Sequence, residues 1–369
     1  MKIPLLDLKA QYKPIKQEID EAVASVVDSQ HFILSEEVTA LEEEIAAYTG
    51  AGHAVGVASG TDALILALRA LGVGKKDAVI TTPFTFFATA EAISVVGATP
   101  VFADIDPETY NIDPDKIEEM LRDTVKAVIP VHLYGQCADM DRIMDISKKY
   151  DLKVVEDCAQ AIGAAYKGRK AGSFGEAGAF SFFPSKNLGG FGDGGMVVSS
   201  DAGLTERVKR LRVHGSQRQY VHTEVGYNSR LDSIQAAVLR VKLKKLDSWL
   251  DRRRAIARRY DEALSSPGIT TPKTAEGGTH TYHQYTIAAH DRDSLLKYLN
   301  DKGISARVYY PVPLHLQPCY KDLGYKEGDF PAAEKASKEV LSLPVYPGLS
   351  DENIDHIIQT VRDFHRQGG

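Results

Sequence analysis

Residues 153–157 read Lys-Val-Val-Glu-Asp, and residues 179–190 read Ala-Phe-Ser-Phe-Phe-Pro-Ser-Lys-Asn-Leu-Gly-Gly. Both stretches contain a short apolar run that gives way to polar residues, which is typical of a buried strand whose carboxyl end meets a ligand. Similar runs recur nearby, and the expected strands lie at 54–58, 78–82, 99–105, 126–131, 153–156, 179–183 and 196–199. Helical patterns with apolar residues three and four positions apart fall between them, at 62–71, 87–96 and 138–150. The alternation predicts an α/β fold with a mainly parallel, seven-stranded sheet flanked by helices.

The pattern changes near residue 245. Residues 231–264 form one long helical pattern rich in Arg and Lys. The elements expected beyond it are a strand at 282–288, a helix at 293–302, a strand at 305–310 and a helix at 351–366. We therefore expect two domains, an N-terminal arm with a large α/β domain over 1–245 and a small α+β domain over 246–369.

The composition is that of an ordinary globular protein. Hydrophobic residues make up 43% of the 369 residues, and 50 acidic residues outnumber 44 basic ones, for a formal charge of -6. Without a basic excess, no nucleic-acid partner is expected. The apolar runs fall far short of the roughly 20 residues that cross a bilayer, and the first residues lack the apolar core of a signal peptide. We expect no membrane partner and a cytoplasmic location.

The three cysteines, Cys137, Cys158 and Cys319, are odd in number and form no Cys-x-x-Cys pair. This pattern favours neither a disulfide framework nor a zinc site. We expect all three to be small buried apolar residues, and we expect no metal site.

Two polar residues stand where expected strands end. Asp157 follows an apolar pair, so its carboxylate would enter the ligand crevice, where it is costly unless a cation meets it. Lys186 follows the strand that reaches Ser181 and precedes a glycine cluster at 189–195, which lets backbone approach a ligand closely. The simpler alternatives are an Asp that caps the next helix and a solvated surface Lys.

A third polar turn, Ser59-Gly60-Thr61, joins an expected strand to the helix expected from Asp62. Free N–H groups at a helix start bind anions, so this turn is a candidate phosphate site; the alternative is a plain cap by Ser59 or Thr61. The chain has no Gly-x-x-x-x-Gly-Lys-Ser/Thr motif, and its glycine cluster lacks the strand-turn-helix context of a dinucleotide fingerprint. An enzyme that uses a nicotinamide nucleotide is therefore disfavoured.

These three features match the needs of one cofactor, pyridoxal 5'-phosphate. It requires a Lys amine for its Schiff base, a carboxylate that keeps its pyridine nitrogen protonated, and donors for its phosphate. The protonated ring withdraws electrons from the reacting carbon, while the released Lys moves a proton.

Five motifs follow one another through the chain. They are Ser-Gly-Thr-Asp-Ala-Leu at 59–64, Thr-Phe-Phe-Ala-Thr at 85–89, Glu-Asp-Cys-Ala-Gln at 156–160, Ser-Phe-Phe-Pro-Ser-Lys at 181–186 and Gly-Tyr-Asn-Ser-Arg-Leu-Asp at 226–232. In content and order they resemble the DegT/DnrJ/EryC1/StrS aminotransferases, over essentially the whole chain. The resemblance implies the pyridoxal-phosphate-dependent transferase fold of type I.

By this resemblance, Lys186 is the Schiff-base lysine, Asp157 is the partner of the pyridinium nitrogen, and Phe86 stacks on the cofactor ring. Gln160 would lie over the cofactor, near its ring oxygen or the lysine. Family members that act on 3-keto nucleotide sugars tend to carry Gln here, whereas many that act at carbon 4 carry His. The resemblance therefore favours a 3-keto substrate.

The resemblance assigns the phosphate site to Gly60, Thr61 and Ser181, joined by Asn228 from a neighbouring subunit. It thus implies a homodimer with shared active sites. From the residues alone, Asn228 and Arg230 lie in a polar turn before a long helix, which is equally typical of a helix cap.

Three segments, at 213–215, 218–222 and 309–315, resemble the substrate loops of sugar aminotransferases. The candidate substrate-binding residues are Tyr310 and His315 in the last segment, together with Arg230, whose guanidinium suits a carboxylate or pyrophosphate. The alternative for the last segment is a Pro-rich connection with a structural role.

The implied activity is transfer of an amino group from L-glutamate to a keto nucleotide sugar, with a UDP or dTDP carrier, in a ping-pong cycle. Two alternatives stay open. The same machinery could serve scyllo-inosose or a related cyclitol, because those aminotransferases can also carry Gln at position 160. The fold could instead be a pyridoxal-phosphate-binding regulatory scaffold, which the acidic charge disfavours. A 3-dehydratase is disfavoured because that branch replaces the Schiff-base lysine, here Lys186, with His.

Overall fold

A seven-stranded sheet forms the centre of the larger part of the protein in the computed structural model, which describes residues 2–265 and 268–366. Its strands, in spatial order, are β1 (His53–Val57), β9 (Gly195–Ser199), β8 (Ala177–Ser181), β5 (Lys153–Asp157), β4 (Val125–Val128), β2 (Ala78–Thr81) and β3 (Thr99–Phe102). β9 runs antiparallel to both neighbours, and the other neighbouring pairs are parallel. The predicted mainly parallel, seven-stranded sheet is confirmed.

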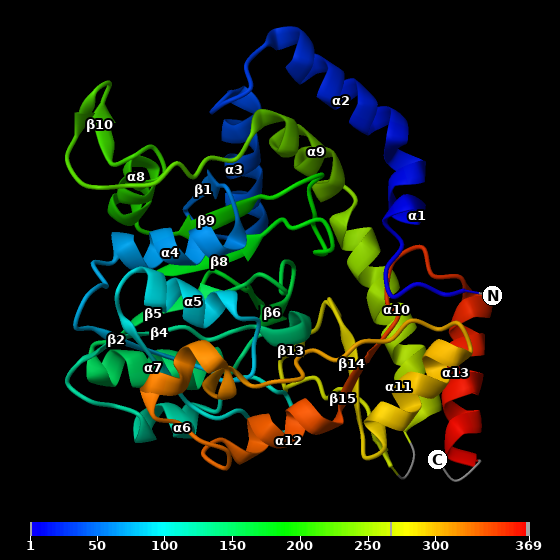
Figure 1. Cartoon of the computed structure of the whole chain (residues 1–369). Coiled ribbons are helices and arrows are strands. Elements are labelled where there is room, and N and C mark those ends of the chain that lie inside the picture. Colours follow the sequence, from blue (N-terminus) through cyan, green and yellow to red (C-terminus); the bar gives the residue numbers. More distant parts are fainter. Residues whose placement is uncertain (1, 266–267, 367–369) are drawn as a thin grey trace.

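Helices cover both faces of this sheet (Figure 1). One face carries α4 (Gly60–Ala70), α5 (Ala88–Val95) and α8 (Ala202–Leu211), and the other carries α3 (Glu36–Thr49), α6 (Pro114–Glu119), α7 (Met140–Tyr150) and α9 (Ser233–Leu243). Because side chains alternate along a strand, Val155 packs on the α4 side and its neighbour Val154 on the α7 side. The three helices predicted before residue 151 are confirmed as α4, α5 and α7.

The ends of α7 show how the sequence sets these elements. The Asp139 side chain accepts a hydrogen bond from the N–H of Arg142 and so caps the helix. Met140 and Ile143, three positions apart, face the core and are buried. Asp151 ends the helix in the left-handed conformation, and the chain turns directly into β5.

The N-terminal arm contacts both the large part, which is built around the seven-stranded sheet, and a small C-terminal part. It consists of α1 (Leu8–Tyr12), the 3-10 turn η1 (Lys13–Ile15) and α2 (Lys16–Ser29). Ile19 of α2 packs against Val238 of α9 in the large part. Ahead of α1, Ile3 pairs with Ile304 and is buried in the core of the small part. The arm therefore completes the small core as well as covering the large one.

The small part is an α+β unit with its own apolar core. Its elements are α10 (Leu246–Leu264), β12 (Ile269–Thr270), β14 (Tyr285–Ala289), α11 (Arg292–Asp301), α12 (Pro331–Glu339), β15 (Val340–Leu343) and α13 (Asp351–Arg366). The strand predicted at 282–288 and the helices predicted at 293–302 and 351–366 are confirmed as β14, α11 and α13.

Two predictions in this region are wrong. Residues 231–264 form two helices, α9 and α10, because the chain turns at Lys244 and Lys245. α10 then runs from the large core, which holds Leu246 and Leu250, into the second core, which holds Ile256 and Tyr260. Residues 305–310 form no strand, since Arg307 alone of them pairs with β15, at Ser342. The place beside β14 is taken by β15, which was not predicted.

Two small sheets extend from this framework. β13 (Gly278–Thr279) pairs with β6 (Ala165–Tyr166), which also pairs with β7 (Arg169–Lys170), so a segment beyond α10 is hydrogen-bonded to the large part. The hairpin of β10 (Ser216–Arg218) and β11 (Val221–His222) projects from the large part beside α8 (Figure 1).

The structure bears on the expectations about membrane-spanning helices and about the burial of the cysteines. Among the described helices, none combines the length and apolar character needed to span a membrane. Cys137 and Cys158 are buried as expected, but Cys319 is exposed, because it lies in the surface 3-10 turn η4 (Pro318–Leu323).

Candidate active site

The polar strand ends predicted from the sequence meet at one edge of the sheet. β5 ends at Asp157 and β8 ends at Ser181, and β1 leads through Ser59 into α4. Because these three strands are parallel to one another, their carboxyl ends lie at the same edge. Ligands collect at this edge in α/β sheets.

Asp157 is held by two hydrogen bonds. Its Oδ2 accepts from the hydroxyl of Thr89 at 2.8 Å, and its Oδ1 accepts from the N–H of Ala159 at 3.1 Å. The residue is 6% exposed, so its charge is largely shielded from water. Asp157 does not cap a helix; its carboxylate is a buried acceptor that suits a cationic partner.

Lys186 lies near this carboxylate, in the turn that follows β8. Its N–H donates to the carbonyl of Phe183 at 2.8 Å, which closes the turn. Burial lowers the pKa of Lys186 to about 8, against the opposing attraction of Asp157. An amine with this pKa is substantially neutral near pH 8, as a nucleophile must be.

Another lysine with a lowered pKa serves as a contrast. Lys242 of α9 is 5% exposed and donates to the carbonyl of Gly189. Burial lowers its pKa to about 8 as well. No carboxylate contributes to that shift, so Lys242 lacks the anionic partner that distinguishes Lys186.

The start of α4 forms the predicted anion site. Ser59 caps the helix by accepting from the N–H of Asp62 at 3.0 Å. Within the described residues, the N–H groups of Gly60 and Thr61 donate to no other group, so they are available to an anion. The Oγ of Ser181 accepts from the N–H of Phe183 at 3.3 Å, which leaves its own proton free to donate. The cap and the anion site are thus compatible.

An aromatic face and an amide complete the site. Phe86 is 57% exposed, and its ring centroid lies 6.2 Å from that of Tyr310. The Oε1 of Gln160 accepts from the N–H of Tyr134 at 2.7 Å, so its Nε2 must be the group that donates to the Tyr310 hydroxyl at 3.0 Å. Burial raises the pKa of Tyr310, which therefore keeps its proton.

The other predicted site residues, His315, Asn228 and Arg230, differ in burial and in contacts. His315 is buried against Phe330 and its Nε2 contacts Glu334 at 3.1 Å, a packing that does not present it to the site. Asn228 is exposed and Arg230 is partly exposed. Between them, Ser229 donates to Asp62 at 2.7 Å, which fixes this segment beside the start of α4.

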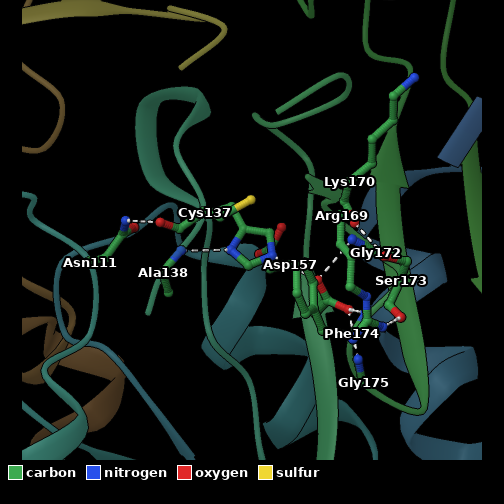
Figure 2. Close-up of polar contacts among 12 residues, drawn as sticks. Asn111, Cys137, Ala138, Asp157, Arg169, Lys170, Gly172, Ser173, Phe174 and Gly175 are labelled. Carbon is green, nitrogen blue, oxygen red and sulfur yellow. Dashed lines mark hydrogen bonds and ion pairs between the residues drawn. The ribbon is translucent and has the colours of Figure 1, made fainter. Parts of the chain in front are cut away.

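Glu156 anchors the strand end on the opposite face of the sheet. Its carboxylate accepts three backbone N–H groups of the loop at 172–175 and contacts His132 Nε2, all at 2.7 to 2.9 Å. The three residues that donate these N–H groups, Gly172, Phe174 and Gly175, are labelled in Figure 2. His132 Nδ1 accepts from the N–H of Ala138, so the ring proton is on Nε2 and donates to Glu156. The backbone N–H of His132 also donates to the Asp157 carbonyl at 3.0 Å, which fixes the main chain that carries the carboxylate.

This anchor also brings together potential metal ligands. His132, Glu156 and Cys158 each offer one ligand atom, and these atoms lie within 4.8 Å of one another. The His and Glu atoms are already hydrogen-bonded. Burial raises the pKa of the Cys158 thiol well above its ordinary value, which keeps the thiol protonated and a poor ligand. We interpret the cluster as part of the framework.

Two residues near the site were not assigned from the sequence. Thr89 belongs to the motif at 85–89, and its contact with Asp157 joins α5 to β5 across 68 positions of chain. His283 lines a small cavity with Ser185, and burial together with the charges of Lys186 and Arg253 holds its pKa well below the ordinary value. No local pattern marks His283, because it is nearly a hundred positions from Lys186 in the chain.

Known proteins resemble this chain over almost its full length. A pleiotropic regulatory protein from Geobacillus stearothermophilus is 50% identical over 99% of both chains. A UDP-N-acetyl-3-dehydro-alpha-D-glucosamine 3-aminotransferase from Acidithiobacillus ferrooxidans is 47% identical, over 98% of this chain and 97% of its own. The crystal structure of S. venezuelae DesV in complex with a ketimine intermediate is similar with a TM-score of 0.97 and 45% identity, over 98% of both chains.

The profile of the DegT/DnrJ/EryC1/StrS aminotransferase family matches residues 13–362. This match confirms the resemblance that the five sequence motifs indicate, and the similarity to DesV confirms the expected fold class. The chain belongs to the DegT/DnrJ/EryC1/StrS aminotransferase family.

Proposed function

We propose that the protein is a pyridoxal-phosphate-dependent aminotransferase that moves an amino group from L-glutamate to the keto group of a nucleotide-linked sugar. The observation that carries this proposal is the amine of Lys186, whose pKa is lowered to about 8 by desolvation, near the buried carboxylate of Asp157 at the ligand edge of the sheet. The membership of an aminotransferase family supports the reaction, and the name of the Acidithiobacillus relative supports a 3-keto UDP-sugar as the substrate class.

The residues at the sheet edge fit the cofactor. When bound, the cofactor supplies an aldehyde carbon that captures amines and a protonated ring that withdraws electrons. Lys186 Nζ would be the amine that the aldehyde captures, and as a free amine it could take and return a proton. Asp157 would hold the positive ring nitrogen. The N–H groups of Gly60 and Thr61 and the hydroxyl of Ser181 suit its phosphate.

The aromatic and amide groups bind and orient. Phe86 offers an exposed ring face for stacking on the cofactor. Gln160 fixes the Tyr310 hydroxyl, whose proton is then free to donate toward the sugar. We propose Gln160 as the residue that favours a ketone at carbon 3, and Tyr310 as a substrate contact. The buried contact with Glu334 makes His315 the weakest of the substrate candidates.

We propose a homodimer with shared sites. Asn228 and Arg230 make no hydrogen bond through their side chains to other described residues, and both are at least partly exposed. This leaves them available to a second subunit, where Asn228 would bind the cofactor phosphate and Arg230 a substrate anion. The boundary between domains near residue 245 and the cytoplasmic location stay predictions.

The function is tested with two half-reactions. Purified protein with pyridoxal phosphate and L-glutamate should release 2-oxoglutarate before any sugar is added. The protein that has taken up the amino group should then aminate a nucleotide 3-keto sugar. UDP- and dTDP-linked substrates should be compared with scyllo-inosose in the same assay. A requirement for both substrates before either product forms would contradict the ping-pong cycle, and amination of inosose alone would favour the cyclitol alternative.

The name of the Geobacillus relative raises a regulatory function for this fold. A scaffold without catalysis does not need a lysine amine whose pKa is lowered to about 8 beside a carboxylate. Reconstituted protein with no visible absorption band, or with a band unchanged in Lys186→Ala, would favour the regulatory scaffold.

A further inference from the structure

The buried Thr89 contacts the carboxylate of Asp157. It is 0% exposed, in the first turn of α5, three residues after Phe86. Its Oγ1 lies 2.8 Å from Asp157 Oδ2, 3.2 Å from Thr85 Oγ1 and 3.3 Å from the carbonyl of Phe86. The hydroxyl thus has three possible partners but only one proton.

The distances and charges decide where that proton goes. Asp157 is the closest acceptor and the charged one, so the Thr89 hydroxyl donates to it. Thr89 Oγ1 is then an acceptor toward Thr85, whose hydroxyl has no other hydrogen-bond partner among the described side chains. The result is a directed chain in which Thr85 donates to Thr89 and Thr89 donates to Asp157. Each donation strengthens the next.

We propose that Thr89, supported by Thr85, is a positioning residue that keeps the Asp157 carboxylate oriented toward a cationic ring nitrogen. The other oxygen of Asp157 is fixed by Ala159, so the two donors together set the plane of the carboxylate. The inference rests on the proposed function, because the carboxylate needs this orientation only if it meets the cofactor.

Other titratable groups surround the same carboxylate. Lys186 and Tyr310 interact with it electrostatically from the turn after β8 and from the loop at 309–315. Glu156 precedes it on β5 but points to the opposite face, where His132 and backbone donors hold it. None of these groups replaces the hydroxyl of Thr89 as a neutral donor on Oδ2.

The test compares Thr89→Val, which removes the hydroxyl at nearly constant shape, with Thr89→Ser, which keeps it. The readouts are the pH midpoint of the visible absorption band of the holoenzyme and the dissociation constant of pyridoxal phosphate. In Thr89→Val, the ring nitrogen is held less firmly as a cation, so the Schiff base on Lys186 keeps its proton to higher pH and the midpoint rises. The dissociation constant should rise about tenfold, and Thr89→Ser should restore both values.

Two further variants make the test specific. Thr81 is also 0% exposed and donates to the carbonyl of Ile129 at 2.9 Å, away from Asp157. Thr81→Val should lower thermal stability without moving the absorption midpoint. Thr85→Val breaks only the hydrogen bond from Thr85 to Thr89, so a smaller upward shift of the absorption midpoint is expected. If Thr89→Val does not fold, Thr85→Val serves as the test variant.

The outcomes separate the two proposals. If wild-type protein with pyridoxal phosphate shows no visible band, the proposed function fails. If wild type shows the band and Thr89→Val has the same midpoint and the same dissociation constant, the role of Thr89 is overturned. When Thr89→Val does not fold, an unshifted midpoint in Thr85→Val overturns it.

Discussion

Gly60 packs directly against Ser181: a Cβ atom on Gly60 would lie 2.5 Å from the Cβ of Ser181 and 3.1 Å from its hydroxyl oxygen. This contact joins the start of α4 to the end of β8, so two candidate phosphate-binding elements face the same space. Any larger residue at position 60 must push the helix start away from the strand.

Gly60→Ala should therefore weaken pyridoxal phosphate binding by about tenfold or more, since overpacking costs on the order of 1–3 kcal/mol. The dissociation constant is measured by absorbance titration of apoprotein. Gly74→Ala is the matched control, because a Cβ there would make only an ordinary contact, 3.6 Å from the carbonyl of Val96. Equal affinity in Gly60→Ala and wild type would remove Gly60 from the phosphate site.

Borohydride reduction of the holoenzyme should attach the cofactor to Lys186 and leave Lys242 unlabelled in peptide mapping. Both amines have a pKa lowered to about 8, but only Lys186 faces a carboxylate. Lys186→Ala should lose the label and slow the glutamate half-reaction by roughly 10²–10⁴-fold, the usual value of general acid–base catalysis. Label on Lys242 alone would contradict the assignment.

The rate at which apoprotein captures pyridoxal phosphate should rise with pH and level off above pH 8. The reason is that Lys186 reacts only as the neutral amine, and burial lowers its pKa to about 8 from an ordinary 10.5. Stopped-flow absorbance across pH 6 to 10 measures this profile. A rate that keeps rising to about pH 10 would show that the amine is not desolvated.

Lys242 should make stability depend on pH. Its folded pKa of about 8 lies below the ordinary 10.5, so between these values the unfolded chain binds more protons than the folded one. Stability should then rise with pH from about 8 to 10.5, by at most about 3 kcal/mol from this group. Denaturant titrations of apoprotein should show that rise reduced in Lys242→Met. The same slope in both proteins would contradict the shift.

Tyr310→Phe tests the substrate side of the site. It removes the hydroxyl that Gln160 orients and leaves the aromatic packing with Phe86. The KM for the keto sugar should rise about tenfold, because a hydrogen bond of roughly 1.5 kcal/mol is lost, while the glutamate half-reaction should keep its rate. A loss confined to the glutamate half-reaction would place Tyr310 in a different role.

Local patterns were sufficient to predict the sheet and the groups at its edge. Asp157 and Ser181 end β5 and β8 as expected, because an apolar run followed by polar residues records where a buried strand stops. The antiparallel direction of β9 has no such local mark, since a buried strand has the same composition in either direction. Strand direction is decided by how the chain returns to the sheet.

The wrong predictions have a similar cause. The turn at Lys244 and Lys245 interrupts the helix although both residues favour helix. α10 begins against the large core with Leu246 and Leu250 and enters the second core from Ile256 on, so tertiary packing decides the direction of the chain there. The role of His315 as a substrate contact stays a prediction, and no local pattern indicates that Glu334 and Phe330 enclose its side chain. Thr89 reaches Asp157 across 68 positions of chain, a distance that no local pattern can report.

The pairing of β13 with β6 limits how the protein can admit a large substrate. The small part cannot swing open as a rigid lid without giving up this pairing and the two bonds that Gln136 makes to Lys273 and Ala275, each worth about 1 kcal/mol. We expect substrate entry to depend instead on peripheral loops, while these hydrogen bonds hold the large and small parts together. Selectivity among sugars would then evolve through changes in the sequences of those loops, while the residues at the sheet edge that suit the cofactor keep their positions.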